Sequence, residues 1–357
     1  MNILAFESSC DETACAVVAC EDGRLSIKSN IVASQIETHR LYGGVVPEIA
    51  SRAHVEVISK ITYEALEAAK LSLSDVDLIA VTANPGLIGA LLVAVNFAKS
   101  LAVANGIPLV AVDHIKGHIA ASYIGEDTPK PPFLALAVSG GHTSIYKVES
   151  YTKMVTVGST RDDAIGESFD KIGRLIGIPY PAGRGFDALA REGFEMLVGT
   201  EGDYLKRYSE SEEYKKGDMA LPSPAVKDSS YDFSFSGLKT AAINLLHRYE
   251  QRGEEIDRAR FAARYTYESV FAVQKKLRAA LTAYDGLDLV VAGGVAANSH
   301  LRHALSLLCA ELGRKIFIPH PSLCGDNGAM IGAQGYYEFA AGRLADESLN
   351  ASAMDSQ

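Results

Sequence analysis

The sequence has only five cysteines in 357 residues, and no two of them form a CxxC pair. An odd number without such spacing predicts neither a disulfide framework nor a zinc ribbon, so we expect a reducing, cytoplasmic location. No apolar run reaches the roughly 20 residues that a membrane-spanning helix needs. The start, MNILAFESSCDE, has no basic segment and soon turns polar, which argues against a signal peptide.

Basic residues are outnumbered as well. There are 34 Lys and Arg against 44 Asp and Glu, which gives a formal net charge of -10. Proteins that hold nucleic acid through bulk charge rely on Lys and Arg, so a nucleic-acid partner would need a local basic patch or a basic helper protein. The sequence also has neither a Walker A motif nor a GxGxxG motif, which excludes the commonest phosphate-binding loops.

The chain does contain an internal repeat. A predicted hairpin with the tip SSCDET (8–13) has the same layout as FLALAVSGGHTSIYKV (133–148), and DVDLIAVTANPG (75–86) resembles GLDLVVAGGVAAN (286–298). The strands predicted within 75–86 and 286–298 each follow a helical pattern, and each precedes a further helix and strand. Any two α/β segments look somewhat alike, but here the loops match in order as well as in type. We therefore predict two duplicated α/β lobes with a ligand cleft between them.

The expected boundaries follow from this repeat. The first lobe is predicted to span residues 1–113 and to be completed by a C-terminal helix at 326–343. The second lobe is predicted at 114–325, with a polar, charged insertion at about 195–232. The polar end, residues 344–357, is expected to be a flexible tail.

Two histidines in HIKGH, His114 and His118, have the i, i+4 spacing that puts both on one helix face. Asp326, in the turn CGDNGAM, is either the N-cap of the following helix or a third ligand for the same metal. Two imidazoles and one carboxylate with open positions suit Fe(II) or Zn(II). Because residues 114 and 326 both follow the last strand of a lobe, we favour the metal site.

The SGGHT and AGGVAAN turns are each weak signals for a phosphate-binding loop. Together with SSCDET, in two related lobes, they indicate a nucleotide site, because glycine lets backbone N–H groups approach an anion. Asp11 and Glu12 at the hairpin tip are either a simple polar turn or carboxylates that orient a reacting amine.

Eight motifs in order resemble one family, the tRNA N6-adenosine threonylcarbamoyltransferases, in its bacterial form. They are FESSCDET, YGGVVPEIASRAH, HIKGH, VSGGHT, DDAIGESFDK, DFSFSGLKTA, VAGGVAAN and CGDNGAM, and the resemblance covers residues 1 to about 343. It implies the ASKHA (actin-like ATPase) fold. It also implies transfer of threonylcarbamoyl from threonylcarbamoyl-AMP to N6 of adenosine 37 in tRNAs that read ANN codons, with release of AMP.

The resemblance assigns roles to individual residues. The metal ligands would be His114, His118 and Asp326, holding one Fe(2+) or Zn(2+), and the acidic pair Asp11 and Glu12 would be catalytic. Partners would be tRNA, a TsaB-like paralogue and a TsaE-like ATPase, with no membrane. The residues expected to contact the adenylate are Ala137, Val138, Ser139, Gly140, Gly141, Asp170, Gly183, Asp187 and Asn298. One departure is YPAGRGFD (180–187), where the family usually has YPGGP.

The alternative functions would require different residues from those found in this sequence. A small-molecule kinase of the same fold would not need HxxxH with a distant aspartate. A zinc peptidase would carry the glutamate of HExxH, and this chain has Ile115 at that position. A scaffold without activity would have no use for a metal triad.

Overall fold

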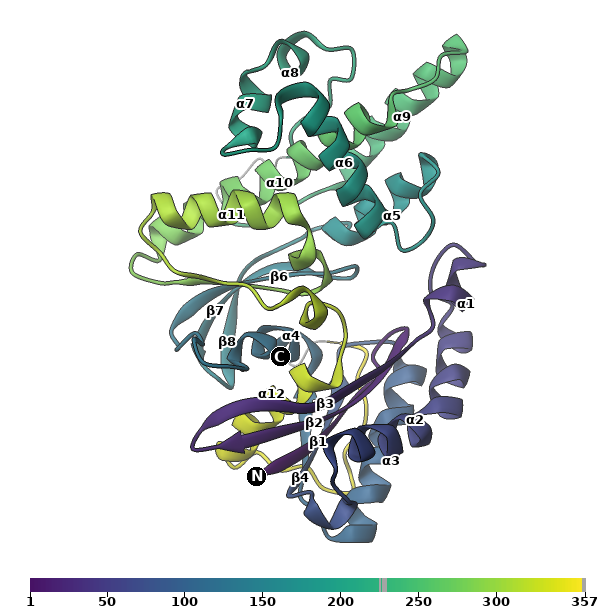
Figure 1. Ribbon diagram of the computed structural model, residues 1–357, viewed down its shortest axis with the longest axis vertical. Coiled ribbons are helices and arrows are strands. Elements are labelled where there is room, and N and C mark those ends of the chain that lie inside the picture. Colours follow the sequence, from purple (N-terminus) through teal and green to yellow (C-terminus); the bar gives the residue numbers. More distant parts are fainter. Residues whose placement is uncertain (225, 227–229, 355–357) are drawn as a thin grey trace. The chain divides into compact units, whose positions relative to one another are not determined.

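Two five-stranded sheets organise the part of the chain that the computed structural model describes, residues 1–224, 226 and 230–354 (Figure 1). The first of its two units contains Met1–Pro132, Val148–Met154 and the described part of Phe317–Gln357. The second unit contains Phe133–Lys147 and Val155–Ile316. The first sheet lies in the first unit, and most of the second sheet lies in the second unit.

The first sheet mixes antiparallel and parallel neighbours. Its central strand β1 pairs antiparallel with β2 and parallel with β4, so that Leu4 lies beside both Val17 and Ile79. These three strands are buried almost throughout, which is typical of strands covered on both faces. In sheet order, the strands are β3 (Arg24–Ser34), β2 (Glu12–Glu21), β1 (Asn2–Glu7), β4 (Leu78–Asn84) and β5 (Leu109–Asp113).

Helices α2 (Pro47–Ala69) and α3 (Ile88–Asn105) cover one face of this sheet (Figure 1). Leu4 and Phe6 of β1 pack into a core with residues of both helices, among them Ile58. By length and composition α3 could also cross a membrane, but its buried side packs on α2 and β4. An apolar helix that lies against a sheet has the same composition, so composition alone does not establish a membrane span.

Helix α12 (Gly328–Ala340) lies on the opposite face, where glycines bring it close to the strands. A Cβ added to Gly332 would lie 2.6 Å from Val18 Cγ2, and one added to Gly335 would lie 2.5 Å from Ala80 Cβ. The glycine face of α12 therefore sets the distance between the helix and the sheet. It also sets the position of the turn that leads into the helix. The remaining short elements of the first unit are α1 (Ile36–Arg40), η1 (Leu73–Asp75), α4 (His114–Ala120), η2 (Ala121–Tyr123) and η4 (Pro321–Leu323).

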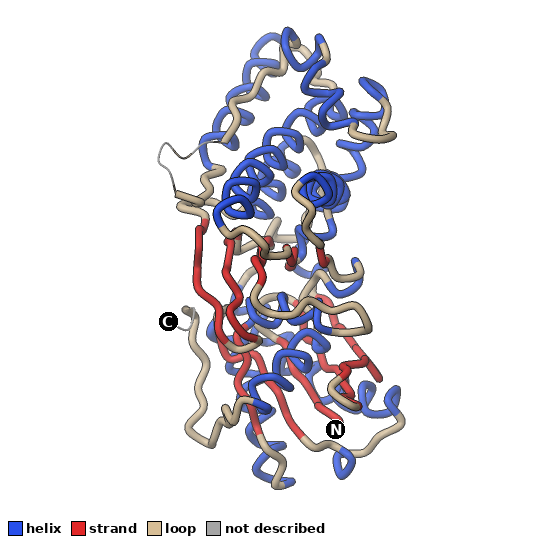
Figure 2. The backbone as a smooth tube through the Cα atoms, turned by 90° about the vertical axis from the view of Figure 1, so that its left-hand side faces the viewer, coloured by secondary structure: helices blue, strands red, loops and turns tan. Residues whose placement is uncertain are grey.

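The second sheet is centred on β6, which pairs parallel with β9. Its helices lie together on one side of the strands (Figure 2), where the 26-residue helix α10 contacts α6, α9 and α11. In sheet order, the strands are β10 (Ile316–Phe317), β9 (Leu289–Ala292), β6 (Phe133–Val138), β7 (Thr143–Ser150) and β8 (Lys153–Ser159). The helices are α5 (Ile165–Leu175), α6 (Gly183–Val198), α7 (Tyr204–Glu210), α8 (Glu212–Lys216), α9 (Ser236–Arg252), α10 (Arg258–Ala283), η3 (Gly294–Ala297) and α11 (Ser299–Glu311).

The two sheets have the same strand order. From the hairpin edge inward, β3–β2–β1–β4–β5 corresponds to β8–β7–β6–β9–β10. In both, a hairpin-like set of three strands comes first in the chain and two later strands extend the sheet on the other side. The predicted duplicated α/β architecture is therefore confirmed.

The two units do not have the same bounds as the predicted lobes. Residues 114–132, 148–154 and 317–325 of the predicted second lobe lie in the first unit, where α4 packs against α12. Of the predicted insertion, 195–232, the structure describes the helices α7 and α8 and their loops. Residues 225 and 227–229 of that insertion lie outside the described residues.

The described end of the chain is not the free tail that its polar composition suggests. The backbone N–H of Ala345 donates to Leu109 O (2.8 Å), and that of Ser352 donates to Ala83 O (2.8 Å). Lys99 Nζ also donates to the carbonyl oxygen of Leu349 (2.8 Å). Backbone hydrogen bonds of this kind do not depend on side-chain polarity, so the sequence gives no sign of them. Residues 355–357 of the predicted tail lie outside the described residues.

The close approach of α12 generates a stability prediction. Gly332→Val should lower the free energy of unfolding by about 1–3 kcal/mol, because the added side chain would overlap Val18 in a packed core. Ala340→Val, on the exposed side of the same helix, is the matched control. Denaturant unfolding measures both, and equal losses would show that helix propensity rather than packing is responsible.

Candidate active site

The HIKGH segment forms the short helix α4 directly after β5. Asp113, the last residue of β5, caps this helix: its Oδ1 accepts hydrogen bonds from the backbone N–H groups of Ile115 (2.9 Å) and Lys116 (3.1 Å). The cap fixes where the helix begins. His114 and His118, one turn apart, consequently lie on the same side, with ring centres 4.5 Å apart.

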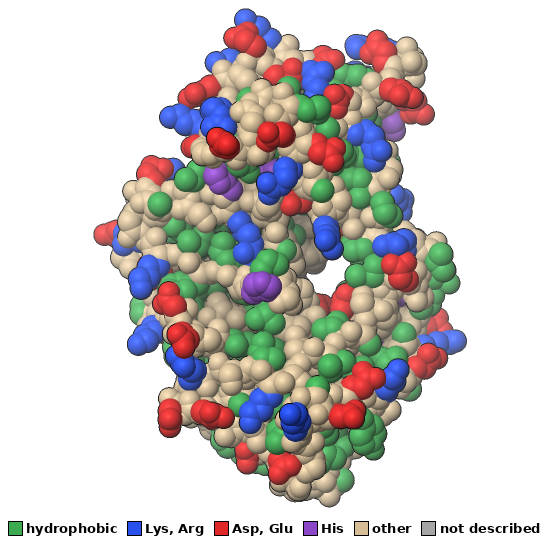
Figure 3. Space-filling view, viewed as in Figure 1, with side chains coloured by type: hydrophobic (Ala, Val, Ile, Leu, Met, Phe, Trp, Pro, Cys, Tyr) green, Lys and Arg blue, Asp and Glu red, His purple; other side chains and the backbone are tan. Residues whose placement is uncertain are grey.

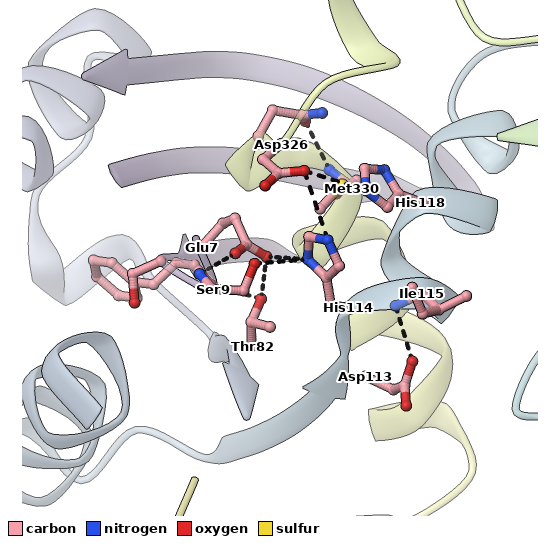
Figure 4. A network of polar contacts seen from close by, with 12 residues as sticks. Glu7, Ser9, Thr82, Asp113, His114, Ile115, His118, Asp326 and Met330 are labelled. Carbon is pink, nitrogen blue, oxygen red and sulfur yellow. Dashed lines mark hydrogen bonds and ion pairs between the residues drawn. The ribbon is translucent and has the colours of Figure 1, made fainter. Parts of the chain in front are cut away.

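Asp326 reaches both histidines from the turn before α12 (Figure 4). Its Oδ1 lies 3.2 Å from His118 Nε2 and 3.6 Å from His114 Nε2. The alternative role, capping α12, belongs to Asn327, whose Oδ1 accepts a hydrogen bond from the Met330 N–H (3.0 Å). Among the described residues, His114, His118 and Asp326 form the one group of potential metal ligands whose ligand atoms all lie within 4.8 Å of one another.

His118 indicates that this group is incomplete without a ligand. The residue is 2% exposed, yet neither of its ring nitrogens has a hydrogen-bond partner in the described part of the chain. Buried polar groups are nearly always satisfied, and an ion bound at Nε2 would supply a partner. Two ligands that each lie about 2.1 Å from one ion are roughly 3–3.4 Å apart. The observed 3.2 and 3.6 Å are close to this, so the three residues fit a divalent metal ion.

Glu7, at the end of β1, orients His114 by contacting its Nδ1, the ring nitrogen that does not face Asp326. Its Oε2 lies 3.0 Å from His114 Nδ1 and accepts a hydrogen bond from Thr82 Oγ1 (2.6 Å). Its Oε1 accepts from the Ser9 N–H (2.5 Å), and Ser9 Oγ lies 3.1 Å from the same His114 nitrogen. A carboxylate can only accept, so Nδ1 carries a proton, and Nε2, which faces Asp326, is the nitrogen available to ligate a metal. This is the tautomer that a metal ligand requires.

The carboxylates around this group attract positive charge. Burial alone would lower the pKa of His114, but the charges of Glu7 and Asp326 outweigh it and raise that pKa to about 9. Burial would likewise raise the pKa of Glu7, but the charge and hydrogen bond of His114 lower it. The centre is thus arranged to hold a cation.

The predicted catalytic pair, Asp11 and Glu12, lies at the tip between β1 and β2. His54 of α2 supports this tip: Thr13 Oγ1 lies 2.7 Å from its Nδ1, and its Nε2 lies 3.0 Å from the carbonyl oxygen of Cys10. Burial, followed by the charges of Asp326 and Asp11, raises the pKa of Glu12 to about 9. The carboxylates of the tip and of the metal group therefore interact within the first unit.

No motif in the sequence marks Glu7 or its partners Ser9 and Thr82 as site residues. A signal for Glu7 nevertheless exists. It ends the apolar strand NILAFE and is completely buried, and a carboxylate is almost never fully buried unless it is paired. The partner could not be read from the sequence, because His114 is 107 residues away.

In the second unit, the predicted Gly-rich turn follows β6. The Ser139 N–H donates to the carbonyl oxygen of His142 (2.8 Å), and the His142 N–H donates to Ser139 Oγ (3.1 Å). These two bonds close a turn around Gly140 and Gly141, both of which are exposed. The turn thus presents backbone to solvent without side chains in the way.

Two further glycines let neighbouring segments press against this turn. A Cβ on Gly166 would lie 2.5 Å from Ser139 O, and one on Gly293, whose φ is +93°, would lie 2.3 Å from Val138 O. Ala137 and Val138 are the last two residues of β6. The AGGVAAN and SGGHT turns are therefore adjacent, as expected for the carboxyl ends of two parallel neighbouring strands.

Asp170 and Gly183 meet at the start of α6. Asp170 Oδ1 accepts a hydrogen bond from the backbone N–H of Ala182 (2.7 Å), the residue just before Gly183. Ala182 is fully buried, and a Cβ on Gly173 would lie 2.4 Å from its Cβ, so an alanine fits at this point of the unusual YPAGRGFD segment. Arg184 is exposed.

Asp187 and Asn298 lie together where α6 meets the first turn of α11. Asp187 Oδ1 accepts hydrogen bonds from Ser299 N–H (2.8 Å) and Oγ (3.1 Å). Asn298 Oδ1 accepts from the Leu301 N–H (2.9 Å), which makes it the N-cap of α11. Since α5 also packs on η3, the predicted adenylate residues gather around the ends of β6 and β9.

Known proteins show a consistent family and fold. A family model described as tRNA N6-adenosine threonylcarbamoyltransferase matches residues 26–333. A relative of that name from Clostridium botulinum (strain 657 / Type Ba4) is 46% identical over 351 residues, which cover 98% of this chain and 96% of the relative. Full-length HypF in its phosphate- and nucleotide-bound form aligns with a TM-score of 0.56 at 14% identity, over 95% of this chain and 46% of that chain. Component A of (R)-2-hydroxyglutaryl-CoA dehydratase from Acidaminococcus fermentans gives 0.50 at 16% identity, over 96% and 99%. These likenesses confirm the predicted ASKHA fold.

The geometry of the metal group predicts the effect of removing one ligand. His118→Ala should weaken binding of Fe(2+) or Zn(2+) by at least about tenfold, because ligand loss costs no less than loss of an outer-shell partner. His320→Ala, which removes an exposed histidine bonded to Ser322, should leave metal binding unchanged. Metal titration of the two purified variants measures this. Equal affinity for both would contradict the assignment of His118 as a ligand.

Proposed function

This chain belongs to the tRNA N6-adenosine threonylcarbamoyltransferase family, and from that premise we propose a role for each of its two groups of site residues. The enzyme is a transferase that forms N6-threonylcarbamoyladenosine in tRNA. We propose threonylcarbamoyl-AMP as the donor and adenosine 37 of tRNAs that read ANN codons as the acceptor. The second unit then binds the adenylate, and the first unit holds the metal ion and the acidic pair.

The observation that carries this proposal is the intact group of His114, His118 and Asp326 in a chain aligned with its relatives over nearly its whole length. The alternative of a kinase with the same fold leaves these three residues without a use. A peptidase is not supported either. Position 115, where HExxH has its glutamate, is a buried isoleucine with 1% exposure.

The reaction sets the demands on the protein. The N6 amine attacks the carbamoyl carbon of the donor, the bond from that carbon to the phosphate oxygen breaks, and the amine loses a proton as AMP leaves. AMP is already a good leaving group, so catalysis consists mainly of positioning and charge stabilisation. A divalent ion bound by the histidines and Asp326 would supply Lewis acidity toward donor oxygens.

We assign Asp11 and Glu12 to the acceptor. Their tip is held rigidly by His54, and Ser34 Oγ donates a hydrogen bond to Glu12 Oε1 (3.2 Å). A carboxylate fixed in this way can accept a hydrogen bond from an amine and take up its proton. The raised pKa of Glu12, about 9, makes it a stronger base than an ordinary glutamate once it is ionised.

We assign the turns of the second unit to the adenylate. The exposed Gly140, Gly141 and Gly294 allow backbone to approach a phosphate closely. In the described structure, Asp187 Oδ1 is occupied by Ser299, which leaves Oδ2 to accept a hydrogen bond from a ribose hydroxyl. Asn298 caps α11 through its oxygen, and its amide N–H groups can donate to a ligand.

For the metal we propose Fe(2+), with Zn(2+) as the alternative. Two imidazoles and one carboxylate with open positions are typical of non-haem Fe(II) sites. Cys10 is close enough for the charges of Asp11 and Asp326 to act on it, but burial and these charges raise its pKa. This disfavours the thiolate, and Cys10 is not among the three residues whose ligand atoms lie together, so no sulfur ligand is included in the proposed site. Metal analysis of protein purified without oxygen distinguishes the two ions.

tRNA is the substrate of this family, and we propose that partners help to hold it. On the face shown in Figure 3, Lys and Arg side chains of the described residues are interspersed with Asp and Glu, and the net charge is -10. Large apolar side chains are exposed on α2 and just after α1, including Leu41 (84%), Tyr42 (58%), Val55 (63%) and Tyr63 (72%). Exposed apolar groups of this size favour a protein interface. We propose a TsaB-like paralogue there, a TsaE-like ATPase as a further partner, and action in the cytoplasm.

The function is tested in cells depleted of the endogenous enzyme. Complementation with this chain should restore N6-threonylcarbamoyladenosine in tRNA, measured by nucleoside mass spectrometry. The His118→Ala variant, expressed at the same level, should not. Failure of the unaltered chain to restore the nucleoside in the presence of its partner proteins would refute the proposed function.

The assignment of the acidic pair gives a separate prediction. Glu12→Gln should lower kcat by about tenfold or more, because the amide cannot take up a proton, while affinity for AMP should stay nearly unchanged. Glu48→Gln, at an exposed glutamate paired with Arg52, is the control. Calorimetry and single-turnover assays separate the two quantities. Loss of AMP affinity with unchanged turnover would contradict this assignment and indicate that Glu12 acts in binding the donor.

A further inference from the structure

The segment that contains α7 has no role in the function proposed above, although one of its side chains is deeply buried. Tyr204, the first residue of α7, is 5% exposed, and its hydroxyl lies 2.6 Å from His300 Nδ1. The segment is fixed in place, because the guanidinium of Arg207 donates to the carbonyl oxygens of Val198 (3.3 Å) and Glu201 (2.6 Å). Tyr204 is thus presented to His300 by a rigid loop and helix.

His300 links Tyr204 to Asp187, because its ring contacts both residues. It is 0% exposed and lies in the first turn of α11, where its Nε2 is 3.2 Å from the backbone carbonyl oxygen of Asp187. A carbonyl can only accept, so Nε2 carries the proton and Nδ1 accepts from the Tyr204 hydroxyl. Burial lowers the pKa of His300, which agrees with a neutral ring. The two bonds fix one tautomer and one ring orientation.

Asp187 is therefore held at two points. Its backbone carbonyl receives the His300 N–H, and its Oδ1 receives the N–H and hydroxyl of Ser299. Both donors come from the first turn of α11, the turn that Asn298 caps. The position of Asp187 Oδ2 depends on how α6 and α11 are aligned, and the bond from Tyr204 to His300 fixes part of that alignment.

We propose that Tyr204 is a positioning residue for adenylate binding, acting through His300 on Asp187. The inference rests on the proposed function, since it requires Asp187 to contact the adenylate. Tyr204 does not touch the ligand in this scheme. Its hydroxyl holds the His300 ring so that Asp187 meets the ribose in one orientation, and the helix α7 becomes part of the nucleotide site.

The alternative is that Tyr204 contributes only packing. Its ring stacks on His303 at 4.6 Å between centres and lies 5.4 Å from the ring of Phe194. Tyr204→Phe keeps these ring contacts and removes only the hydroxyl, so it separates the two explanations.

The test uses the full-length, metal-loaded protein and AMP, the product of the proposed reaction, as the probe. Tyr204→Phe should weaken AMP binding by about three- to tenfold, as expected for one lost hydrogen bond. The KM for threonylcarbamoyl-AMP should rise by a similar factor, with kcat and metal content unchanged. Loss of a buried hydrogen bond lowers Tm under either explanation, but a merely structural role would leave AMP affinity and the ratio of KM to kcat as they were.

Tyr208→Phe is the matched control. Tyr208 lies on the same helix, is buried to the same degree and contacts Phe194, but it makes no hydrogen bond to His300 in the described structure. It should bind AMP as the unaltered protein does. His300→Leu keeps a side chain of similar size but neither accepts from Tyr204 nor donates to Asp187, so adding Tyr204→Phe to it should cause no further loss of AMP affinity.

The possible outcomes distinguish failure of the proposed adenylate site from failure of the role proposed for Tyr204. If the unaltered protein does not bind AMP, the proposed adenylate site is wrong and this inference fails with it. If the unaltered protein binds AMP and Tyr204→Phe binds it equally well, the adenylate site stands and the role of Tyr204 is refuted. Additive losses in the double variant would also refute a route through His300.

Discussion

The buried hydrogen bond between Glu7 and His114 is the interaction on which the first unit depends. An ionised carboxylate with no exposure to water is costly unless it is paired and hydrogen-bonded, and Glu7 is satisfied by His114, Thr82 and Ser9. Because β1, β4 and β5 are parallel neighbours, their carboxyl ends share one edge of the sheet. Glu7 ends β1, Thr82 lies near the end of β4 and His114 follows β5. The bond that stabilises this edge therefore also orients a candidate metal ligand.

Close packing then brings in the third ligand. Asp326 precedes α12, and glycines let this helix lie almost directly on the strands. The same requirement exists at α4, where a Cβ on Gly117 would lie 2.7 Å from Ile331 Cδ1. The glycine between the two histidines therefore lets α4 and α12 approach, which places Asp326 within 3.2 Å of His118. The metal group depends on small residues that carry no chemistry themselves.

The sequence predicted the repeat and the grouping of His114, His118 and Asp326, because strands, turns and i, i+4 spacing are local patterns. It did not predict Glu7, the cap role of Asn327, the bonds of the last residues to β4 and β5, or the contact of Tyr204 with His300. Each of these is a pairing across many residues, set by how elements pack rather than by their own sequence. The sequence did not indicate that α4 packs on α12 within the first unit, for the same reason.

The proposed phosphate-containing donor would meet an acidic protein, and a metal ion held by His114, His118 and Asp326 would offset that charge locally. Burial and the negative charges of Asp326 and Asp11 raise the pKa of Glu12 to about 9. Without a cation, protons on Glu12 and His114 must balance the cluster. A divalent ion in the same place would neutralise the carboxylates, favour ionised Glu12 and leave net attraction for an anionic ligand. The negative charge near the metal group would thus favour binding of a cation, and the cation would in turn favour binding of an anion.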